Sequence, residues 1–212
     1  MSYLMNRKTI LQTIGLILAL TFITDTAFGQ SHAFINAGRS SSAKHLFVTQ
    51  AVEAEFGTYT MTDAEGISDS KTWNGYGFRN AIGTELLKFI QFSANHTFLN
   101  MAGKDSSSER LTGSRLAGEL KFSFASPLGN LEMGAGAIVS RYDMQRQLQN
   151  TSIYGTGIYY TVGVNYFVSS QVSIFGNMKS INETFVRNSG AKLDSDVQTA
   201  TTSAGFGASI WL

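Results

Sequence analysis

The sequence contains no cysteine, a single proline and three histidines among 212 residues. No disulfide can therefore hold the fold, although extracellular proteins often use them. Charged residues are scarce as well, at 15% against roughly 25% in soluble proteins. The net charge is +1, and the clustered Lys and Arg residues of a nucleic-acid-binding face are missing. Composition thus disfavours a nucleic-acid partner. With 43% hydrophobic residues and a mean hydropathy of −0.02, the chain is neither disordered nor a helical membrane protein.

The sequence also lacks an apolar run long enough for a helix that spans a bilayer, since such a helix takes about 20 residues. The longest apolar stretch, residues 13–24, follows Arg7 and Lys8 and precedes a small-x-small triplet at residues 27–29. That order is typical of a secretory signal peptide with its cleavage site. We therefore predict that residues 1–29 are a cleaved signal peptide and that the mature protein is exported.

What the sequence does have is an alternation of apolar and polar residues. Residues 30–44 are small and polar without any period, which predicts a flexible segment after the signal peptide. Beyond them, eight segments alternate with the period of a β-strand, and few stretches carry a helical period. These segments are residues 46–60, 75–87, 89–100, 110–124, 131–142, 153–167, 171–181 and 198–212. The pattern predicts one all-β domain over residues 45–212.

The connections between the segments alternate in length. Four are long and polar, at residues 61–74, 101–109, 143–152 and 182–197, and short turns lie between them. In an up-and-down meander, alternate connections lie at opposite ends of the sheet. Transmembrane β-barrels show this asymmetry, with short periplasmic turns and longer extracellular loops. The sorting of the connections therefore favours a membrane barrel over a soluble sandwich.

Charged side chains within the segments gather on one face, opposite Leu, Val, Phe and Tyr. An Arg or Lys that faces lipid at the midplane costs about 2–4 kcal/mol, so a membrane barrel turns such residues inward. Segment 171–181 is ambiguous, because Phe175 shares its face with Ser173, Asn177 and Lys179. The predicted lumen charges are Glu53, Glu55, Arg79, Glu85, Arg115, Glu119, Lys121 and Glu132.

A soluble barrel with an apolar interior would show the same period with its two faces exchanged. Aromatic residues near the ends of the apolar face, such as Tyr76, Tyr154 and Tyr166, instead fit the interfacial girdles of a membrane barrel. They favour the membrane interpretation.

These features together resemble the small eight-stranded outer-membrane barrels of the OmpA/OmpX type over residues 45–212. The signal peptide, the eight alternating segments and the sorted connections carry the resemblance, and the turn at residues 126–130 is similar to the family's periplasmic turns. The resemblance implies an eight-stranded antiparallel up-and-down transmembrane β-barrel in the bacterial outer membrane. It also implies a monomer without cofactor or metal, in contact with lipid and lipopolysaccharide.

The last segment is similar to the C-terminal signal that such barrels present to the barrel-assembly machinery. The chain ends in Leu212 where the family usually has an aromatic residue, and Trp211 lies on the other face. The resemblance implies an insertion signal formed by Ala204, Phe206, Ala208, Ile210 and Leu212.

The lumen charges leave two functions open. Eight strands enclose an interior just wide enough for side chains to fill, and buried charges must pair. One interpretation is a plug of ion pairs inside a barrel with a structural or surface role, such as envelope integrity, adhesion or resistance. The other is a narrow or gated ion path, because glycines on the lumen face leave space for water. The long connection at residues 182–197 offers a place for a surface ligand.

An enzyme is a further alternative, since lipid A deacylases and acyltransferases resemble this architecture. Of the three histidines, His96 is predicted to lie toward the outer end of a strand on the apolar face. The deacylases carry a His-x-Ser stretch, but Phe98 stands here where Ser belongs. Ser108 and Ser114 are the nearest candidate nucleophiles, and the spacing selects neither. We therefore assign no catalytic residue and expect no enzyme.

Overall fold

The computed structural model describes the chain from residue 46 to residue 212, with short gaps. The described residues are 46–62, 68–87, 89–104, 109–126, 129–146, 149–169, 171–188 and 191–212. The signal peptide predicted over residues 1–29 and the segment predicted over residues 30–44 lie outside them. Within the described ranges, no helix is both long and apolar enough to cross a membrane.

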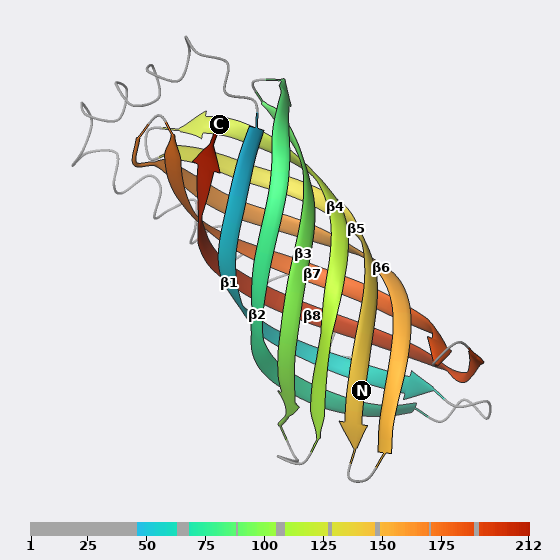
Figure 1. Cartoon of the computed structure of the whole chain (residues 1–212). Helices are drawn as coiled ribbons and strands as arrows, with labels where there is room; N and C mark the ends of the chain where they lie inside the picture. Colours follow the sequence, from blue (N-terminus) through green and yellow to red (C-terminus); the bar gives the residue numbers. More distant parts are fainter. Residues whose placement is uncertain are drawn as a thin grey trace, which may run out of the picture.

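Eight antiparallel strands form one closed barrel (Figure 1). Each strand pairs with the next in sequence, and β1 pairs with β8 to close the sheet. The predicted eight-stranded up-and-down barrel is thereby confirmed. The strands are β1 (Leu46–Thr62), β2 (Ser68–Leu87), β3 (Ile90–Gly103), β4 (Arg110–Ser126), β5 (Gly129–Arg146), β6 (Gln149–Phe167), β7 (Val172–Asn188) and β8 (Ala191–Trp211).

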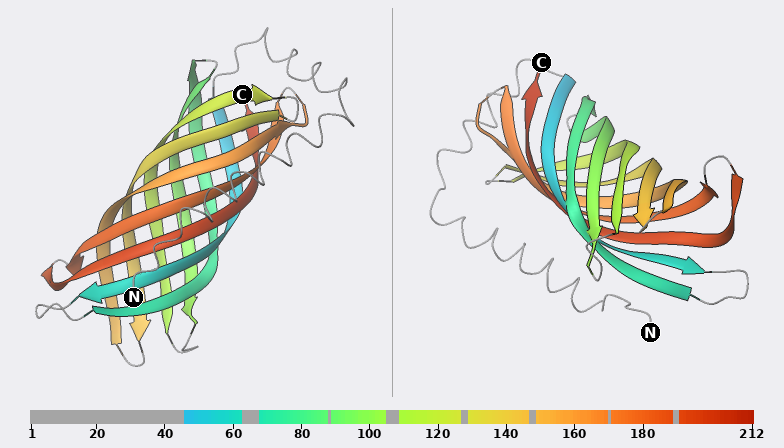
Figure 2. Two further views of the ribbon diagram at one scale, coloured as in Figure 1. Left: turned by 180° about the vertical axis from the view of Figure 1, so that it is seen from behind. Right: turned by 60° about the horizontal axis from the view of Figure 1, so that its bottom comes forward.

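The strands are steeply inclined to the barrel axis, as the view from behind in Figure 2 shows. The hydrogen-bonded row that starts at Val48 on β1 passes through all eight strands and returns to β1 at Thr58, ten residues further along. A stagger of this kind requires a tilt of about 35–45°. We call the end where the β1–β2, β3–β4, β5–β6 and β7–β8 hairpins close the outer end, and the opposite one the inner end.

A broad band of the outer wall, nearest the inner end, exposes apolar side chains. Val52 is 60% exposed, Tyr160 59% and Phe206 66%, although all three are large and apolar. The inward face of the same band buries glutamate, arginine and lysine. Exposed apolar surface of this extent marks contact with lipid, so the soluble barrel with exchanged faces is excluded. We call this band the lipid belt.

The hydrophobic alternation changes phase where the strands leave the lipid belt. On β5, Val139 points outward and Ser140 inward, but two residues later Arg141 points outward and Tyr142 is buried. Inward apolar side chains at the outer end form one cluster, which we call the outer cap. It consists of Tyr59, Trp73, Leu99, Met101, Leu111, Tyr142, Met144, Ile153, Phe185 and Val197. The outer ends of the strands therefore pack like a water-soluble barrel.

The long connections are shorter than the sequence predicts. Strands β7 and β8 extend to Asn188 and from Ala191, so most of residues 182–197 is strand, and β5 and β6 likewise occupy most of residues 143–152. The prediction of four long loops is wrong in this respect. The apolar residues pass from the outward to the inward face at the edge of the lipid belt, so the sequence pattern that predicts a strand ends there. The backbone pairing continues beyond that point.

The lipid belt makes a testable prediction for arginine on the outer wall. Val52→Arg is expected to lower the free energy of unfolding by about 2–4 kcal/mol in lipid vesicles, because it places a cation in hydrocarbon. Thr58→Arg is the matched control, since Thr58 is exposed on the same strand beyond the belt, and we expect a change of at most about 1 kcal/mol. Urea unfolding followed by tryptophan fluorescence measures both. Equal losses for the two variants would contradict the position of the belt.

Candidate functional site: a charge network in the lumen

Most of the predicted lumen charges lie inside the barrel. Glu53, Glu55, Arg79, Arg115, Glu119 and Glu132 are all buried. Lys121 keeps 18% of its side chain exposed, and Glu85 is half-buried beside an irregularity in the β2–β3 pairing. The buried groups form three separate clusters along the lumen.

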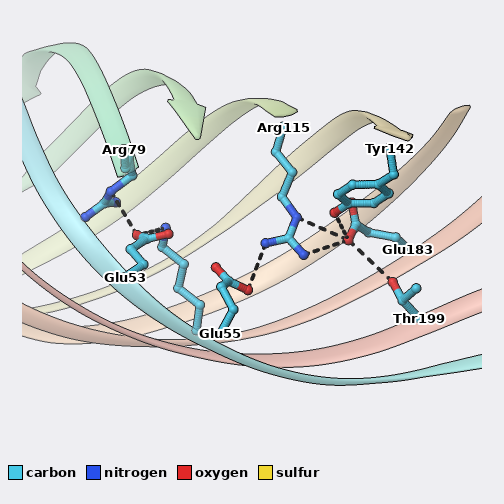
Figure 3. Close-up of polar contacts among 8 residues, drawn as sticks. Glu53, Glu55, Arg79, Arg115, Tyr142, Glu183 and Thr199 are labelled. Atoms are coloured by element: carbon cyan, nitrogen blue, oxygen red, sulfur yellow. Dashed lines mark hydrogen bonds and ion pairs between the residues drawn. The ribbon is translucent and has the colours of Figure 1, made fainter. Parts of the chain in front are cut away.

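The cluster nearest the outer cap is organised by Arg115 on β4 (Figure 3). Its Nη1 donates to Glu55 Oε2 at 3.0 Å, and its Nε and Nη2 donate to Glu183 Oε2 at 3.2 and 2.9 Å. The Tyr142 hydroxyl donates to the same Glu183 oxygen at 2.8 Å, and the Thr199 hydroxyl lies 3.4 Å from it. This outer cluster holds two carboxylates around one guanidinium group, so it carries one excess negative charge.

The central cluster lies further toward the inner end. Glu53 accepts a hydrogen bond from Lys179 Nζ at 2.5 Å, and Arg79 Nε lies 3.0 Å from the same oxygen. Both cations and the carboxylate are buried. The excess positive charge of this cluster offsets the excess negative charge of the outer cluster, because Glu53 and Glu55 are two residues apart on one face of β1. The two clusters together are neutral.

The inner cluster joins Lys121 to Glu132. Lys121 Nζ donates to Glu132 Oε2 at 3.0 Å, and Asn165 Nδ2 donates to Glu132 Oε1 at 3.0 Å. Glu119, between this cluster and the central one, accepts from Ser93 and Asn95 at 3.3 Å each. Glu119 makes no ion pair with any described residue, so its charge is stabilised by these hydrogen bonds and by the field of the nearby lysines.

Each of the four cations also faces an aromatic ring inside the lumen. Arg79 lies 5.3 Å from the centroid of Phe175, Arg115 5.8 Å from Tyr142, Lys121 5.9 Å from Phe47 and Lys179 5.5 Å from Tyr159. The ring face attracts a cation electrostatically, most strongly when both are desolvated. The aromatic rings thus replace part of the hydration that the cations lose.

Glycines make room for the buried glutamates. A Cβ at Gly157 would lie 2.8 Å from the Glu183 side chain, and one at Gly205 would lie 3.1 Å from Glu53. The sequence predicts that lumen glycines leave space for water; at these two positions the opposing side chains occupy it, whereas Gly163 lines a remaining cavity. Each buried glutamate has a glycine as a direct cross-strand partner: the pairs are Glu53–Gly77, Glu55–Gly75, Glu119–Gly136, Glu132–Gly163 and Glu183–Gly157.

The lumen is closed by apolar groups beyond the charges. The outer cap covers the outer cluster, and a floor of Phe47, Phe167 and Trp211 lies at the inner end. The Trp211 and Phe47 rings are 4.7 Å apart, and Trp211 Nε1 donates to Ser173 Oγ at 3.0 Å. Among the described residues, apolar side chains thus lie at both ends of the charge clusters, although Lys121 of the inner cluster stays partly exposed.

Small cavities remain between the clusters. The one above the floor offers about 20 Å³ to the centres of water molecules, which is room for one or two. Its walls include Glu119, Asn165 and Asn177, each with a side-chain oxygen that accepts no hydrogen bond from the described residues. A second cavity of about 20 Å³ lies between the central and outer clusters. Ordered water would satisfy these oxygens.

Two charged residues of the network, Lys179 and Glu183, are absent from the set of lumen charges predicted from the sequence. Lys179 lies on the segment of ambiguous parity, where Phe175 points inward with it and Met178 faces lipid. Glu183 lies in what the sequence predicts to be a loop. The predicted set itself held a usable signal, because five acids against three bases cannot all pair in a dry lumen. That imbalance calls for a further cation, and Lys179 was the candidate on the neighbouring segment.

The apolar residues of the predicted insertion signal all face lipid on β8. Phe206, Ile210 and Leu212 are 66, 55 and 63% exposed, and Ala204 and Ala208 are exposed beside them. The aromatic residue expected at the end is one position earlier and turned inward, as Trp211 of the floor. The Leu212 amide donates to the Leu46 carbonyl at 2.8 Å and helps to close the barrel.

His96 lies within the lipid belt, and its predicted place toward the outer end of a strand is wrong. Strand β3 runs from Ile90 to Gly103, so His96 lies near the middle of that strand. Its ring contacts Phe98 at a centroid distance of 4.2 Å, and Ser114 lies opposite Phe98 on β4. Ser108 lies outside the described residues. Among these residues, no group of three or more His, Asp or Glu side chains is placed to hold a metal ion.

Comparison with known proteins identifies the fold. No protein-family model matches the sequence, and no curated protein sequence does so either. Among solved structures, Neisserial surface protein A superposes with a TM-score of 0.54 at 14% identity, over 79% of this chain and 97% of that one. The fold is that of a small outer-membrane β-barrel.

Two further outer-membrane structures are similar over the same barrel. OprG of Pseudomonas aeruginosa matches with a TM-score of 0.47 at 10% identity, over 79% of this chain and 96% of its own. Ail of Yersinia pestis matches with a TM-score of 0.41 at 15% identity, over 76% and 97%. The lipid belt and the superposition on Neisserial surface protein A agree with the bacterial outer-membrane location expected from the sequence.

The outer cluster makes a testable prediction for stability. Arg115→Met leaves Glu55 and Glu183 without their cation, so we expect the free energy of unfolding to fall by about 3–5 kcal/mol. Arg141→Met is the control, because Arg141 is 57% exposed and lies 3.7 Å from Asp143, a surface pair worth about 1 kcal/mol or less. Urea unfolding in lipid vesicles measures both. A loss at Arg115 no larger than at Arg141 would show that the outer cluster is solvated.

Proposed function

We propose that this protein is a closed outer-membrane barrel with a structural or surface-interaction role in envelope integrity, adhesion or resistance, and that its lumen does not conduct. The observation that carries the proposal is the filled lumen: two neutralising charge clusters lie between the outer cap and the aromatic floor. A barrel filled in this way offers no route for a solute, so its function lies on its outer surface.

The outer end of the barrel supports a surface role. Its strands continue beyond the lipid belt, and the outer cap holds them as one folded unit. The β1–β2 and β7–β8 hairpins project side by side at this end in Figures 1 and 2, where β1 and β8 remain paired as far as Thr62 and Asp196. Loops and strand ends on a rigid scaffold are the usual location of binding sites.

Lipopolysaccharide is the partner that the outer wall supports. Directly beyond the lipid belt, Arg110 and Arg141 point outward, and Arg141 lies over the Tyr154 ring at 5.6 Å. Guanidinium groups at this level are placed to contact lipid phosphates. The barrel-assembly machinery is the partner during insertion, with the apolar face of β8 as its signal.

A narrow ion channel is the second candidate, and the cavities favour it. The cavity above the floor is lined by polar side chains, and oxygens of Glu119, Asn165 and Asn177 remain free to bind water or a cation. A path through the lumen would require Trp211 and the charge clusters to move together. Lipid A modification has less support, because His96 lies within the lipid belt, near the middle of β3.

Conductance separates the closed barrel from the channel. We expect purified protein in planar bilayers to show no steady single-channel current. We also expect none for Trp211→Ala, which removes one ring of the floor but leaves the clusters and the outer cap. A steady current in the unaltered protein that Lys179→Met changes would overturn the closed barrel and support the channel.

A further inference from the structure

Three polar side chains form a row across the lipid belt. Gln50 on β1, Asn80 on β2 and His96 on β3 all point outward, and they are direct neighbours in the strand pairing. Their inward neighbours, such as Ala51 and Ala81, are buried, so the row is part of the outer wall and does not belong to the lumen network. We call these three residues the polar row.

The polar row lies inside the lipid belt, with apolar or small outward residues on both sides. Along β1, Gln50 has Leu46 and Val48 on its inner side and Val52 and Phe56 on its outer side, all more than 40% exposed. Asn80 is likewise flanked by Ile82 and Phe78, and His96 by Ala94 and Phe98. Neither water nor lipid headgroups reach this depth of a bilayer.

The hydrogen bonds within the barrel leave most of the row's polar atoms without a partner. Among the described residues, the hydrogen bond within the row runs from Gln50 Nε2 to Asn80 Oδ1, at a long 3.4 Å. The Asn80 amide group, the Gln50 carbonyl and a ring nitrogen of His96 remain available as donors or acceptors. Polar groups left without a partner in hydrocarbon cost free energy, which a polar contact from outside the barrel would recover.

The outward residues beside the polar row have small side chains. Ala94 and Gly118 are outward neighbours on β3 and β4, and Ala208 faces Gln50 on β8. A Cβ at Gly118 would meet nothing closer than the Phe92 ring at 3.9 Å, so packing within this chain does not require glycine there. Small residues on a lipid-facing surface let a second backbone approach closely, so that polar side chains can meet.

From the polar row and the small residues beside it we infer that this face of the barrel wall binds a second copy of the same chain within the membrane. The row contains amides and an imidazole but no carboxylate or ammonium group, and amides are complementary to themselves. Two copies inserted in the same direction are related by a two-fold axis along the membrane normal. With Asn80 near that axis, it meets the same side chain of the other copy, and Gln50 and His96 lie on either side of that contact. The monomer expected from the resemblance is then not the state in lipid.

Cysteine cross-linking tests this inference directly, because the chain has no cysteine of its own. Ile82→Cys places a thiol next to Asn80, whereas Met133→Cys places one on β5, in an equally exposed position away from the row. We expect mild oxidation in lipid vesicles to give roughly tenfold more disulfide-linked dimer for Ile82→Cys than for Met133→Cys. Replacing Gln50, Asn80 and His96 with leucine in the Ile82→Cys protein is expected to remove that excess.

Leucine suits a lipid-facing position, so the leucine variant should still fold, and its heat-dependent migration on SDS gels checks this. Equal cross-linking at the two positions, or cross-linking unchanged by the leucine substitutions, would overturn the inference. If oxidation of native membranes instead gave an adduct whose mass differs from two copies, the partner of the row would be another protein.

Discussion

An eight-stranded barrel in a bilayer can carry its charges on one side of the wall only. An Arg or Lys turned to lipid costs about 2–4 kcal/mol, and the interior of eight strands is only wide enough for side chains. Most of the charges that this rule places inside therefore pair with one another, and Glu119 is held by hydrogen bonds. Arg115 joins Glu55 to Glu183, and Glu53 joins Arg79 to Lys179. The glycines opposite the buried glutamates follow from the same lack of space.

The change of phase along the strands shows where this constraint ends. Inside the lipid belt the apolar face is outside, and beyond it the apolar face is inside, in the outer cap. The barrel thus has the apolar outer surface of a membrane protein at the inner end and the apolar interior of a soluble barrel at the outer end. Side chains occupy most of the lumen in both parts, with small cavities between the charge clusters.

The sequence was sufficient to predict those parts of the strands in which the apolar residues stay on the outward face. Eight strands, their order, the closure by β8 and the burial of Glu53, Arg115 and Glu119 could all be inferred, because lipid enforces strict alternation. The extent of the strands could not, since apolar residues such as Tyr142 and Phe185 change sides at the edge of the belt. Partner choice within the network was also out of reach, because it depends on register across strands that are distant in sequence.

Exchange of the Arg115 side-chain protons with water tests the sealed lumen most directly. Arg115 Nε donates to Glu183 at 3.2 Å beneath the outer cap, so a closed barrel predicts a sharp Nε–H signal in NMR spectra of the protein in lipid nanodiscs. That signal should exchange far more slowly than that of the exposed Arg141. Exchange of Arg115 as fast as that of Arg141 would show that bulk water reaches the network and would contradict the closed lumen.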